Sequence, residues 1–253
     1  MSSILLYGPP GGGKTTLAAT MTLLGYRCIW IDADRKVRTM HNLKPLVEQG
    51  KIEVRETKSP LVDSSLRDRV LLGPKQGPII QPKGYLEVVD QISDLEENPP
   101  EDASNCVIVL DSLTRVVEHM KRLILHMQKK GHMEFAEWGF ILTNLEELFV
   151  SFFGLQPDKY KHCIIICHDM IEKDELLGSV KILPLIDGQM RQKAGSYVEE
   201  LYYCFVDVDK AGNTAFQVQT KPIGKVMHCR TSRTLEVFEE ANFLNLFRDE
   251  VKK

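Results

Sequence analysis

Continuous runs of apolar residues recur along the chain and alternate with longer segments of helical pattern. The runs predict strands at Ile4–Tyr7, Cys28–Asp32, Ile52–Arg55, Cys106–Leu110, Cys163–Cys167 and Leu201–Val206. The intervening segments predict helices after Lys14, ending near Gly25, and over Tyr85–Glu97, Leu113–Lys130 and Glu134–Phe153. Continuous runs are typical of parallel strands that are covered on both faces. The alternation of strand and helix therefore predicts an α/β fold with a doubly wound, mostly parallel sheet.

Two regions depart from this alternation. Residues 59–84 hold four prolines and three glycines, which predicts a long irregular insertion. After Leu201 the stretches "LYYCFVDV", "TAFQVQT" and "KVMHCRT" predict a closing set of antiparallel strands, a C-terminal β extension over residues 201–233. A length of 253 residues fits one domain over residues 1–253.

Composition and charge narrow the class of protein. A hydrophobic content of 43% and a charged content of 26% are ordinary for a soluble globular enzyme. No run has the roughly 18 apolar residues of a membrane helix, and "MSSILLYG" lacks a secretory signal. The six cysteines, most of them in apolar strand-like runs, predict buried thiols in a reducing cytoplasm. Because the net charge is −3, any contact with nucleic acid needs a local basic patch.

The stretch "GPPGGGKT" follows the first predicted strand and precedes a predicted helix. It matches the P-loop pattern G-x-x-x-x-G-K-[ST], in which backbone N–H groups and a helix N-terminus surround a phosphate. In this pattern Lys14 reaches the β- and γ-phosphates of ATP, and the Thr15 hydroxyl ligates Mg²⁺. The predicted nucleotide-binding residues are Gly8, Pro9, Pro10, Gly11, Gly12, Gly13, Lys14, Thr15 and Thr16.

A carboxylate for the magnesium ion is predicted at Asp111. It ends the buried run "CVIVLD", and a strand end beside the P-loop strand would point it toward the metal. The pair Thr15 and Asp111 is therefore the predicted metal site, and ATP and Mg²⁺ are the predicted ligands.

The remaining marks distinguish between classes of P-loop protein. The glycine loop resembles that of AAA+ proteins, but Ser112 stands where those motors have a catalytic glutamate. "WIDAD", Trp30 to Asp34, resembles the strand end at which RecA-type ATPases place their water-activating acid. The resemblance gives Asp34 the role of general base, with Asp32 as its orienting neighbour, although Asp replaces the usual Glu. It also implies that His168, at the end of "CIIICH", senses the γ-phosphate.

Lys14–Thr15, Asp34, Asp111–Ser112 and His168, in this order, resemble the small RecA-like ATPases encoded by phages, which include single-strand annealing recombinases. The resemblance spans nearly the whole chain, including "FAEWGFILTNLEELF" and "GQMRQKAGSYVEELYY". It implies the core strand order 5-1-4-3-2, with the His168 strand between the P-loop and Asp111 strands. It also implies DNA-stimulated ATP hydrolysis in phage recombination, annealing or replication, in the host cytoplasm.

The family further implies partners. These are single-stranded DNA, a single-strand binding protein, and other copies of the chain in a ring or filament. In such an assembly Lys193, and after it Arg191, would reach the γ-phosphate of a neighbour. The regions after the Asp111 and His168 strands are expected to bind DNA, as is the basic stretch 221–233. The basic residues that could neutralise its phosphates are Lys121, Arg122, Lys129, Lys130, Arg191, Lys193, Lys221, Lys225, Arg230 and Arg233. Two alternatives stay open at this point: a P-loop kinase acting on a small molecule, and a non-catalytic assembly module switched by ATP.

Overall fold

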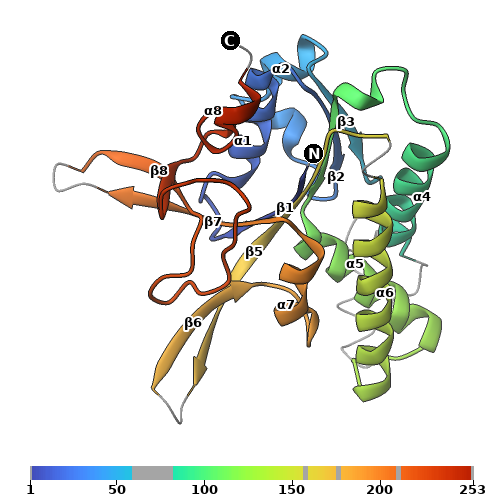
Figure 1. Ribbon diagram of the computed structural model, residues 1–253. Helices are drawn as coiled ribbons and strands as arrows, with labels where there is room; N and C mark the ends of the chain where they lie inside the picture. Colours follow the sequence, from blue (N-terminus) through green and yellow to red (C-terminus); the bar gives the residue numbers. More distant parts are fainter. Residues whose placement is uncertain (1, 59–81, 156–158, 175–177, 209–211, 252–253) are drawn as a thin grey trace.

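A sheet of nine strands organises the part of the chain that this computed structural model describes, residues 2–58, 82–155, 159–174, 178–208 and 212–251. Figure 1 shows the sheet between two groups of helices. The strand order is β3-β2-β4-β5-β1-β7-β8-β9, with β6 paired to β5. The strands are β1 Ser2–Gly8, β2 Arg27–Asp32, β3 Ile52–Glu56, β4 Cys106–Asp111, β5 His162–Asp174, β6 Ser179–Pro184, β7 Glu200–Val208, β8 Thr214–Gln219 and β9 Phe238–Glu240.

The parallel core has the strand order expected from the sequence. The P-loop strand β1 lies between β5 and β7, and β4 and β2 follow beyond β5, all parallel. Numbered in the RecA manner as β1, β2, β4, β5 and β7, these five strands have the order 5-1-4-3-2, and β3 extends the sheet beside β2. The mostly parallel α/β fold is thereby confirmed. Because the carboxyl ends of parallel strands lie at one edge, this order gathers Gly8, Asp32, Asp111 and His168 there.

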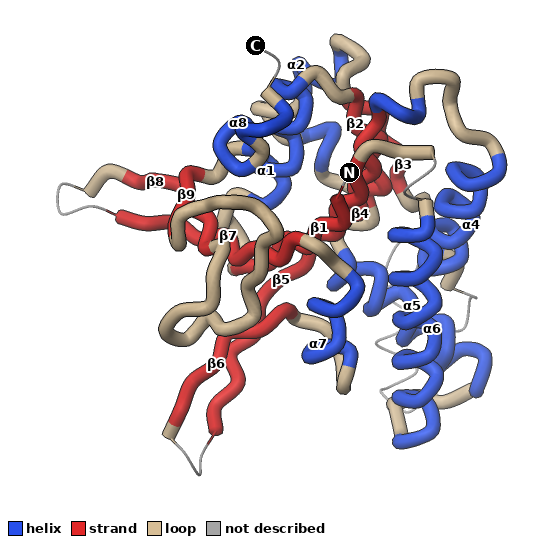
Figure 2. Tube along the Cα trace, viewed as in Figure 1, coloured by secondary structure: helices blue, strands red, loops and turns tan. Residues whose placement is uncertain are grey.

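Helices cover both faces of the sheet, as Figure 2 shows in blue. One layer consists of α4 Gly84–Glu97, α5 Leu113–Gln128 and α6 Phe135–Gly154, whose apolar sides join one buried cluster. The opposite cluster contains residues of α1 Lys14–Ala19, of the 3₁₀ turn Thr20–Leu24 and of α8 Phe243–Leu246. The shorter helices are α2 Lys44–Glu48 and α7 Met190–Lys193, with further 3₁₀ turns at Val37–Thr39, Ala103–Asn105, Ala194–Tyr197 and Arg248–Glu250. The predicted helices are confirmed to within a few residues at their ends.

Burial of the strands explains their unbroken apolar runs. Ile4 through Tyr7 have no exposed surface, since side chains on both faces of β1 meet a helical layer. All six cysteines are buried thiols that form no disulfide, as the sequence predicts. None of the helices among the described residues has the length and apolar character needed to cross a membrane.

The C-terminal strands differ from the prediction. β7 and β8 form the expected antiparallel pair, but "KVMHCRT" is not a strand. Only isolated bridges form there, Ile223 with Val226 and Leu201 with Arg230, and the strand beside β8 is β9. The buried amide of Gln219 donates to the carbonyls of Lys221, Ile223 and Val226. The carbonyls of Val226 and His228 thus accept from the side chains of Gln219 and Tyr7, so this segment meets part of its hydrogen-bonding need without a neighbouring strand.

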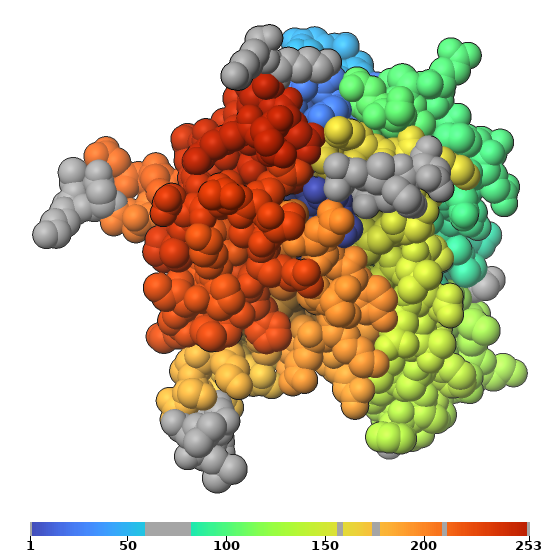
Figure 3. Space-filling model, viewed as in Figure 1, coloured from blue at the N-terminus to red at the C-terminus, as the bar shows by residue number. Residues whose placement is uncertain are grey.

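The expected loop after His168 also contains regular structure. β5 continues to Asp174 and pairs antiparallel with β6. This β5–β6 hairpin and the β7–β8 ribbon project from the body in Figures 1 and 3. Most of the predicted insertion, residues 59–81, lies outside the described residues.

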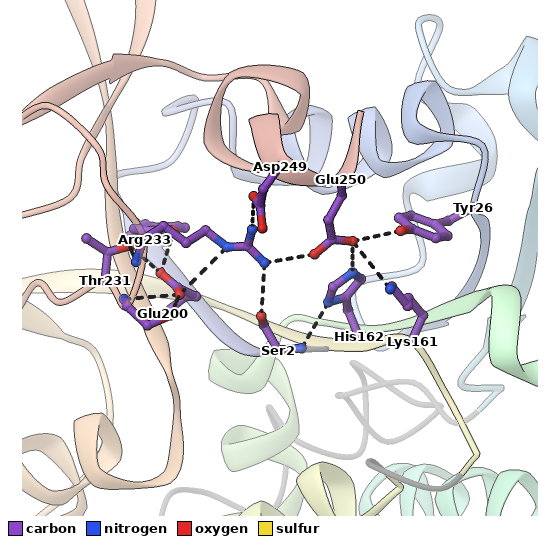
Figure 4. A network of polar contacts seen from close by, with 11 residues as sticks. Ser2, Tyr26, Lys161, His162, Glu200, Thr231, Arg233, Asp249 and Glu250 are labelled. Atoms are coloured by element: carbon purple, nitrogen blue, oxygen red, sulfur yellow. Dashed lines mark hydrogen bonds and ion pairs between the residues drawn. The ribbon is translucent and has the colours of Figure 1, made fainter. Parts of the chain in front are cut away.

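A polar network closes the opposite edge of the sheet, where the strands begin (Figure 4). Arg233 contacts Glu250 at 2.8 Å and also pairs with Asp249 and the wholly buried Glu200. Glu250 in turn accepts from the Tyr26 hydroxyl at 2.7 Å and meets His162 Nε2 at 3.1 Å. These contacts hold the C-terminal segment against the amino ends of β5 and β7.

Candidate functional site

The glycine loop between β1 and α1 lies on the backbone of β7. A Cβ added at Gly8 would stand 2.1 Å from the carbonyl oxygen of Cys204, and one at Gly12 would stand 2.9 Å from it. Gly11 and Gly13 have φ angles of +80° and +82°, which side chains other than glycine's rarely adopt. Close approach and left-handed backbone thus account for the glycines.

Lys14 and Thr15 point from the first turn of α1 into the site. The buried Lys14 ammonium donates to the carbonyl oxygens of Gly8 and Pro9, at 2.7 Å each. Burial lowers the pKa of Lys14. The Thr15 hydroxyl donates to Asp111 Oδ2 at 2.9 Å.

Asp111 ends β4 with almost no exposed surface. Burial raises its pKa to about 6, although the hydrogen bond from Thr15 opposes the shift. The peptide bond from Asp111 to Ser112 is cis. A hydroxyl and a carboxylate side by side are the hard oxygen donors that Mg²⁺ prefers, so Thr15 and Asp111 fit this ion.

Asp34 lies beside Asp111 because the segment after β2 runs along the end of β4. The N–H of Ala33 donates to the Asp111 carbonyl at 2.7 Å. Asp34 Oδ2 accepts from the Ser112 hydroxyl at 3.1 Å and from Lys36 Nζ at 2.8 Å.

The second carboxylate oxygen of Asp34, Oδ1, accepts from Arg115 Nε at 3.1 Å. Burial alone would raise the pKa of Asp34, but Lys36 and then Arg115 more than reverse that effect and hold it below the usual range. The carboxylate is therefore ionised at neutral pH.

Asp32 has a different environment. Its wholly buried carboxylate accepts from the backbone N–H groups of Arg35, Lys36 and Val37 at 2.8, 2.9 and 2.7 Å. Burial raises the pKa of Asp32, and these hydrogen bonds oppose it. Asp32 thus fixes the backbone that carries Asp34.

His168 lies opposite Gly8 in the β1–β5 register, next to the P-loop. The backbone N–H of His168 donates to the Thr114 hydroxyl at 3.0 Å. The buried Nδ1 has no hydrogen-bond partner among the described residues. Burial, and after it the charge of Lys14, lowers the pKa of His168, so the ring is neutral at pH 7.

Of these side chains, those of Lys14, Thr15, Asp34, Asp111 and His168 line a cleft of about 340 Å³. It is lined by Pro10, Gly11, Gly12, Gly13, Lys14, Thr15, Thr16, Asp34, Lys36, Met40, Asp111, Ser112, Ile166, His168 and Phe216. Arg191 and Lys193 do not line it. They lie on α7, where they pair with Glu172 and Glu146 at 3.2 and 2.8 Å.

Lys36, Met40 and Phe216 are among the cleft residues that were not predicted from the sequence as site residues. Lys36 follows Asp34 by two positions, a spacing that could have suggested it. Met40 comes from the connection after β2. Phe216 comes from β8, and its ring lies on Gly13, where an added Cβ would meet Cδ1 at 2.7 Å. Only the pairing of β7 with β8 brings it there, so no local signal marks it.

Comparisons with known proteins agree with this geometry. A family model described as an AAA domain matches residues 2–234, a range far longer than the glycine loop that carries the AAA+ resemblance in the sequence. No curated protein sequence is similar enough to count as a match.

Among solved structures, the fold is similar to that of a prototypical ATPase from the type III secretion system of pathogenic bacteria (12% identity, TM-score 0.47, 83% of this chain and 51% of that one). It is also similar to the RadB recombinase (14%, TM-score 0.44, 87% of each chain). A third is EscN in complex with its central stalk EscO from enteropathogenic E. coli (12%, TM-score 0.48, 83% and 42%). The chain thus spans about half the length of the secretion ATPases.

Proposed function

Because the chain belongs to the AAA domain family whose model spans residues 2–234, we propose that it is a Mg²⁺-dependent ATPase of RecA-like fold that acts on single-stranded DNA. The observation that carries the ATPase part is one cleft that contains a P-loop lysine, a hydroxyl–carboxylate pair and a separate ionised carboxylate. Phosphate binding, metal binding and proton acceptance thereby fall to different side chains.

ATP would lie along the P-loop with its γ-phosphate toward Asp34. Lys14 turns from the loop carbonyls to the β- and γ-phosphate oxygens. A water oxygen bonds to the γ-phosphorus while the bond from phosphorus to the β–γ bridging oxygen breaks, and ADP leaves with that electron pair. The proton of the water passes to the Asp34 carboxylate, which is ionised and lies in the same cleft.

Thr15 and Asp111 would hold Mg²⁺. The ion supplies positive charge that neutralises phosphate oxygens. The Thr15 hydroxyl, which now donates to Asp111, would then offer its oxygen to the ion, so the resting hydrogen bond keeps both ligands oriented.

His168 is proposed to couple the nucleotide to DNA. It stands beside the P-loop on β5, and the same strand continues into the β5–β6 hairpin. We therefore expect a contact between His168 and the γ-phosphate to shift the conformation of the hairpin.

The β5–β6 hairpin and the adjoining loop 221–227 are the proposed DNA surface. The two are joined by a hydrogen bond from the N–H of Ile182 to the carbonyl of Lys225 at 2.9 Å. Their exposed lysines are Lys173, Lys181, Lys221 and Lys225, and their exposed apolar side chains are Ile171, Ile223 and Met227. Cations for phosphates and apolar groups for bases together suit a single strand.

The earlier basic set, on α5 and directly after it, is a weaker candidate. Lys121 is paired with Glu118 and Asp187, and Lys130 with Glu134 and Glu137.

We further propose that copies of the chain assemble into a ring or filament on DNA. Lys193, and after it Arg191, would extend from one copy to the γ-phosphate bound by the next. This is compatible with their position on α7, outside their own cleft. The remaining proposals are a role in phage recombination, annealing or replication, a single-strand binding protein as partner, and the cytoplasm as the site of action.

The decisive experiment is ATP hydrolysis by the purified chain with and without single-stranded DNA, at fixed salt because phosphate contacts depend steeply on it. We expect Mg²⁺-dependent hydrolysis that rises with DNA, and none from Asp111→Asn. ATP turnover that does not change with DNA and that transfers the phosphate to a small acceptor instead of water would indicate a kinase. Binding of ATP without turnover would indicate a switched assembly module.

A further inference from the structure

We infer that Lys36 is a γ-phosphate-binding residue supplied by the same chain, and that its move to the phosphate frees Asp34 to receive the proton of the attacking water. The inference rests on the proposed ATPase activity. It gives the cleft a second cation besides Lys14, on the side where β2 and β4 end.

The backbone at Lys36 is held in place. Its N–H donates to the buried Asp32 carboxylate at 2.9 Å, and the flanking residues Arg35 and Val37 donate to the same carboxylate. Arg35 has a left-handed φ of 58°, which turns the chain back toward the cleft. Because the backbone of this segment is fixed, the Lys36 side chain starts from a defined position beside the cleft, as a ligand-binding residue requires. An ordinary surface lysine has no such backbone anchor.

The side chain of Lys36 is 47% exposed and lines the cleft together with Lys14, Thr15 and Asp111. Its ammonium group ends 2.8 Å from Asp34 Oδ2. A bound triphosphate would bring several negative charges into this space, and phosphate oxygens are strong acceptors for a lysine ammonium.

The Asp34 carboxylate keeps hydrogen bonds to both of its oxygens when Lys36 moves away. Oδ1 keeps its hydrogen bond from Arg115 Nε, and Oδ2 keeps the one from the Ser112 hydroxyl. The departure opens one acceptor position on Oδ2 of Asp34, a residue that lines the cleft. In the structure Lys36 occupies that position, so the general base is covered until a γ-phosphate draws the cation away.

The test compares Lys36→Gln, Lys36→Arg and the control Lys44→Gln. Lys44 is an exposed lysine paired with Glu48 on α2 and is absent from the cleft. For each variant, affinities for ADP and for a non-hydrolysable β,γ-imido analogue of ATP are measured by titration with Mg²⁺. We expect Lys36→Gln to weaken the triphosphate analogue about tenfold while ADP binding stays within about twofold, because only the γ-phosphate contact is lost.

Lys36→Arg should restore most of the lost affinity, and Lys44→Gln should match the wild type. Equal weakening of ADP and the analogue by Lys36→Gln, or no weakening of either, would overturn the inference even if the wild type hydrolyses ATP. A wild type that discriminates the two nucleotides through Lys36 but hydrolyses nothing would refute the proposed ATPase and leave the Lys36 contact standing.

Discussion

Asp32 and Asp34 lie two residues apart, yet we expect substitution of Asp32 to lower stability and substitution of Asp34 to lower turnover. Replacing Asp32 by alanine removes the acceptor of three backbone N–H groups, of which that of Val37 is fully buried. Replacing Asp34 by alanine removes the partner of three side chains, Ser112, Lys36 and Arg115. The two cations among these are 47% and 40% exposed, so both can turn to water.

The expected magnitudes follow from these partners. An orphaned buried N–H costs about 1–3 kcal/mol. Because two of the three N–H groups freed by Asp32→Ala are only partly buried, and because burial of the carboxylate itself is unfavourable, we expect a net loss of about 3 kcal/mol in the free energy of unfolding. For Asp34→Ala, solvent screening limits the loss to about 1 kcal/mol.

The assay is thermal and urea unfolding followed by circular dichroism at pH 7. A loss of about 3 kcal/mol in a domain of this size lowers the Tm by roughly 6–12 °C. Turnover should follow the opposite ranking: Asp34→Asn should bind ATP but lose most hydrolysis, while Asp32→Asn should be milder. If Asp32→Ala melts within about 2 °C of the wild type, or if Asp34→Ala is the less stable variant, the backbone-anchoring role of Asp32 is refuted.

Five further outcomes are expected. Lys14→Ala should abolish hydrolysis and sharply weaken nucleotide binding in a titration, and Asp111→Asn should lose Mg²⁺-dependent turnover with an unchanged circular dichroism spectrum; normal turnover in either contradicts the site. His168→Ala should bind nucleotide normally but erase the difference in single-stranded DNA affinity between the ATP and ADP states, and a preserved difference would make it a core histidine. Lys193→Ala mixed with Lys14→Ala should regain partial hydrolysis at mixed interfaces, which a monomer with full activity would disprove. Glu250→Gln should destabilise the protein most at pH 7 and less, but still measurably, at pH 3: its contacts hold the folded pKa far below the unfolded value of about 4.3, so its contribution is complete above that value and is lost progressively as pH falls from there to the folded pKa. Equal losses at both pH values in urea unfolding would contradict this.

The parallel core was predictable because its signals are local. An unbroken apolar run such as Cys106–Leu110 identifies a strand covered on both faces, and a polar residue directly after it, Asp111, must lie at the strand's carboxyl end. The glycine-rich P-loop pattern by itself predicts the geometry of the phosphate-binding loop. Once the strand order is known, Thr15 and Asp111 have to meet, as they do at 2.9 Å.

The C-terminal part was less predictable because its structure depends on contacts between distant residues. The apolar residues Val226 and Cys229 of "KVMHCRT" are buried and favour a strand in the sequence, but Gln219 satisfies the Val226 carbonyl, a role that no spacing in the sequence reveals. The position of Phe216 depends on the register in which β8 pairs with β7. Lys36 is marked in the sequence only as a charge, because its direction depends on three hydrogen bonds to Asp32.

The packing of the glycine loop on β7 has a mechanical consequence. With no side chain at Gly8 or Gly12, the loop rests on the Cys204 carbonyl, backbone on backbone. The next strand of the same ribbon, β8, covers Gly13 with Phe216. The β7–β8 ribbon thus contacts the glycine loop at both ends of the loop, and these contacts are too close for the two to move independently. We therefore expect a displacement of the β7–β8 ribbon to move the glycine loop, and a shift of the loop to move the ribbon.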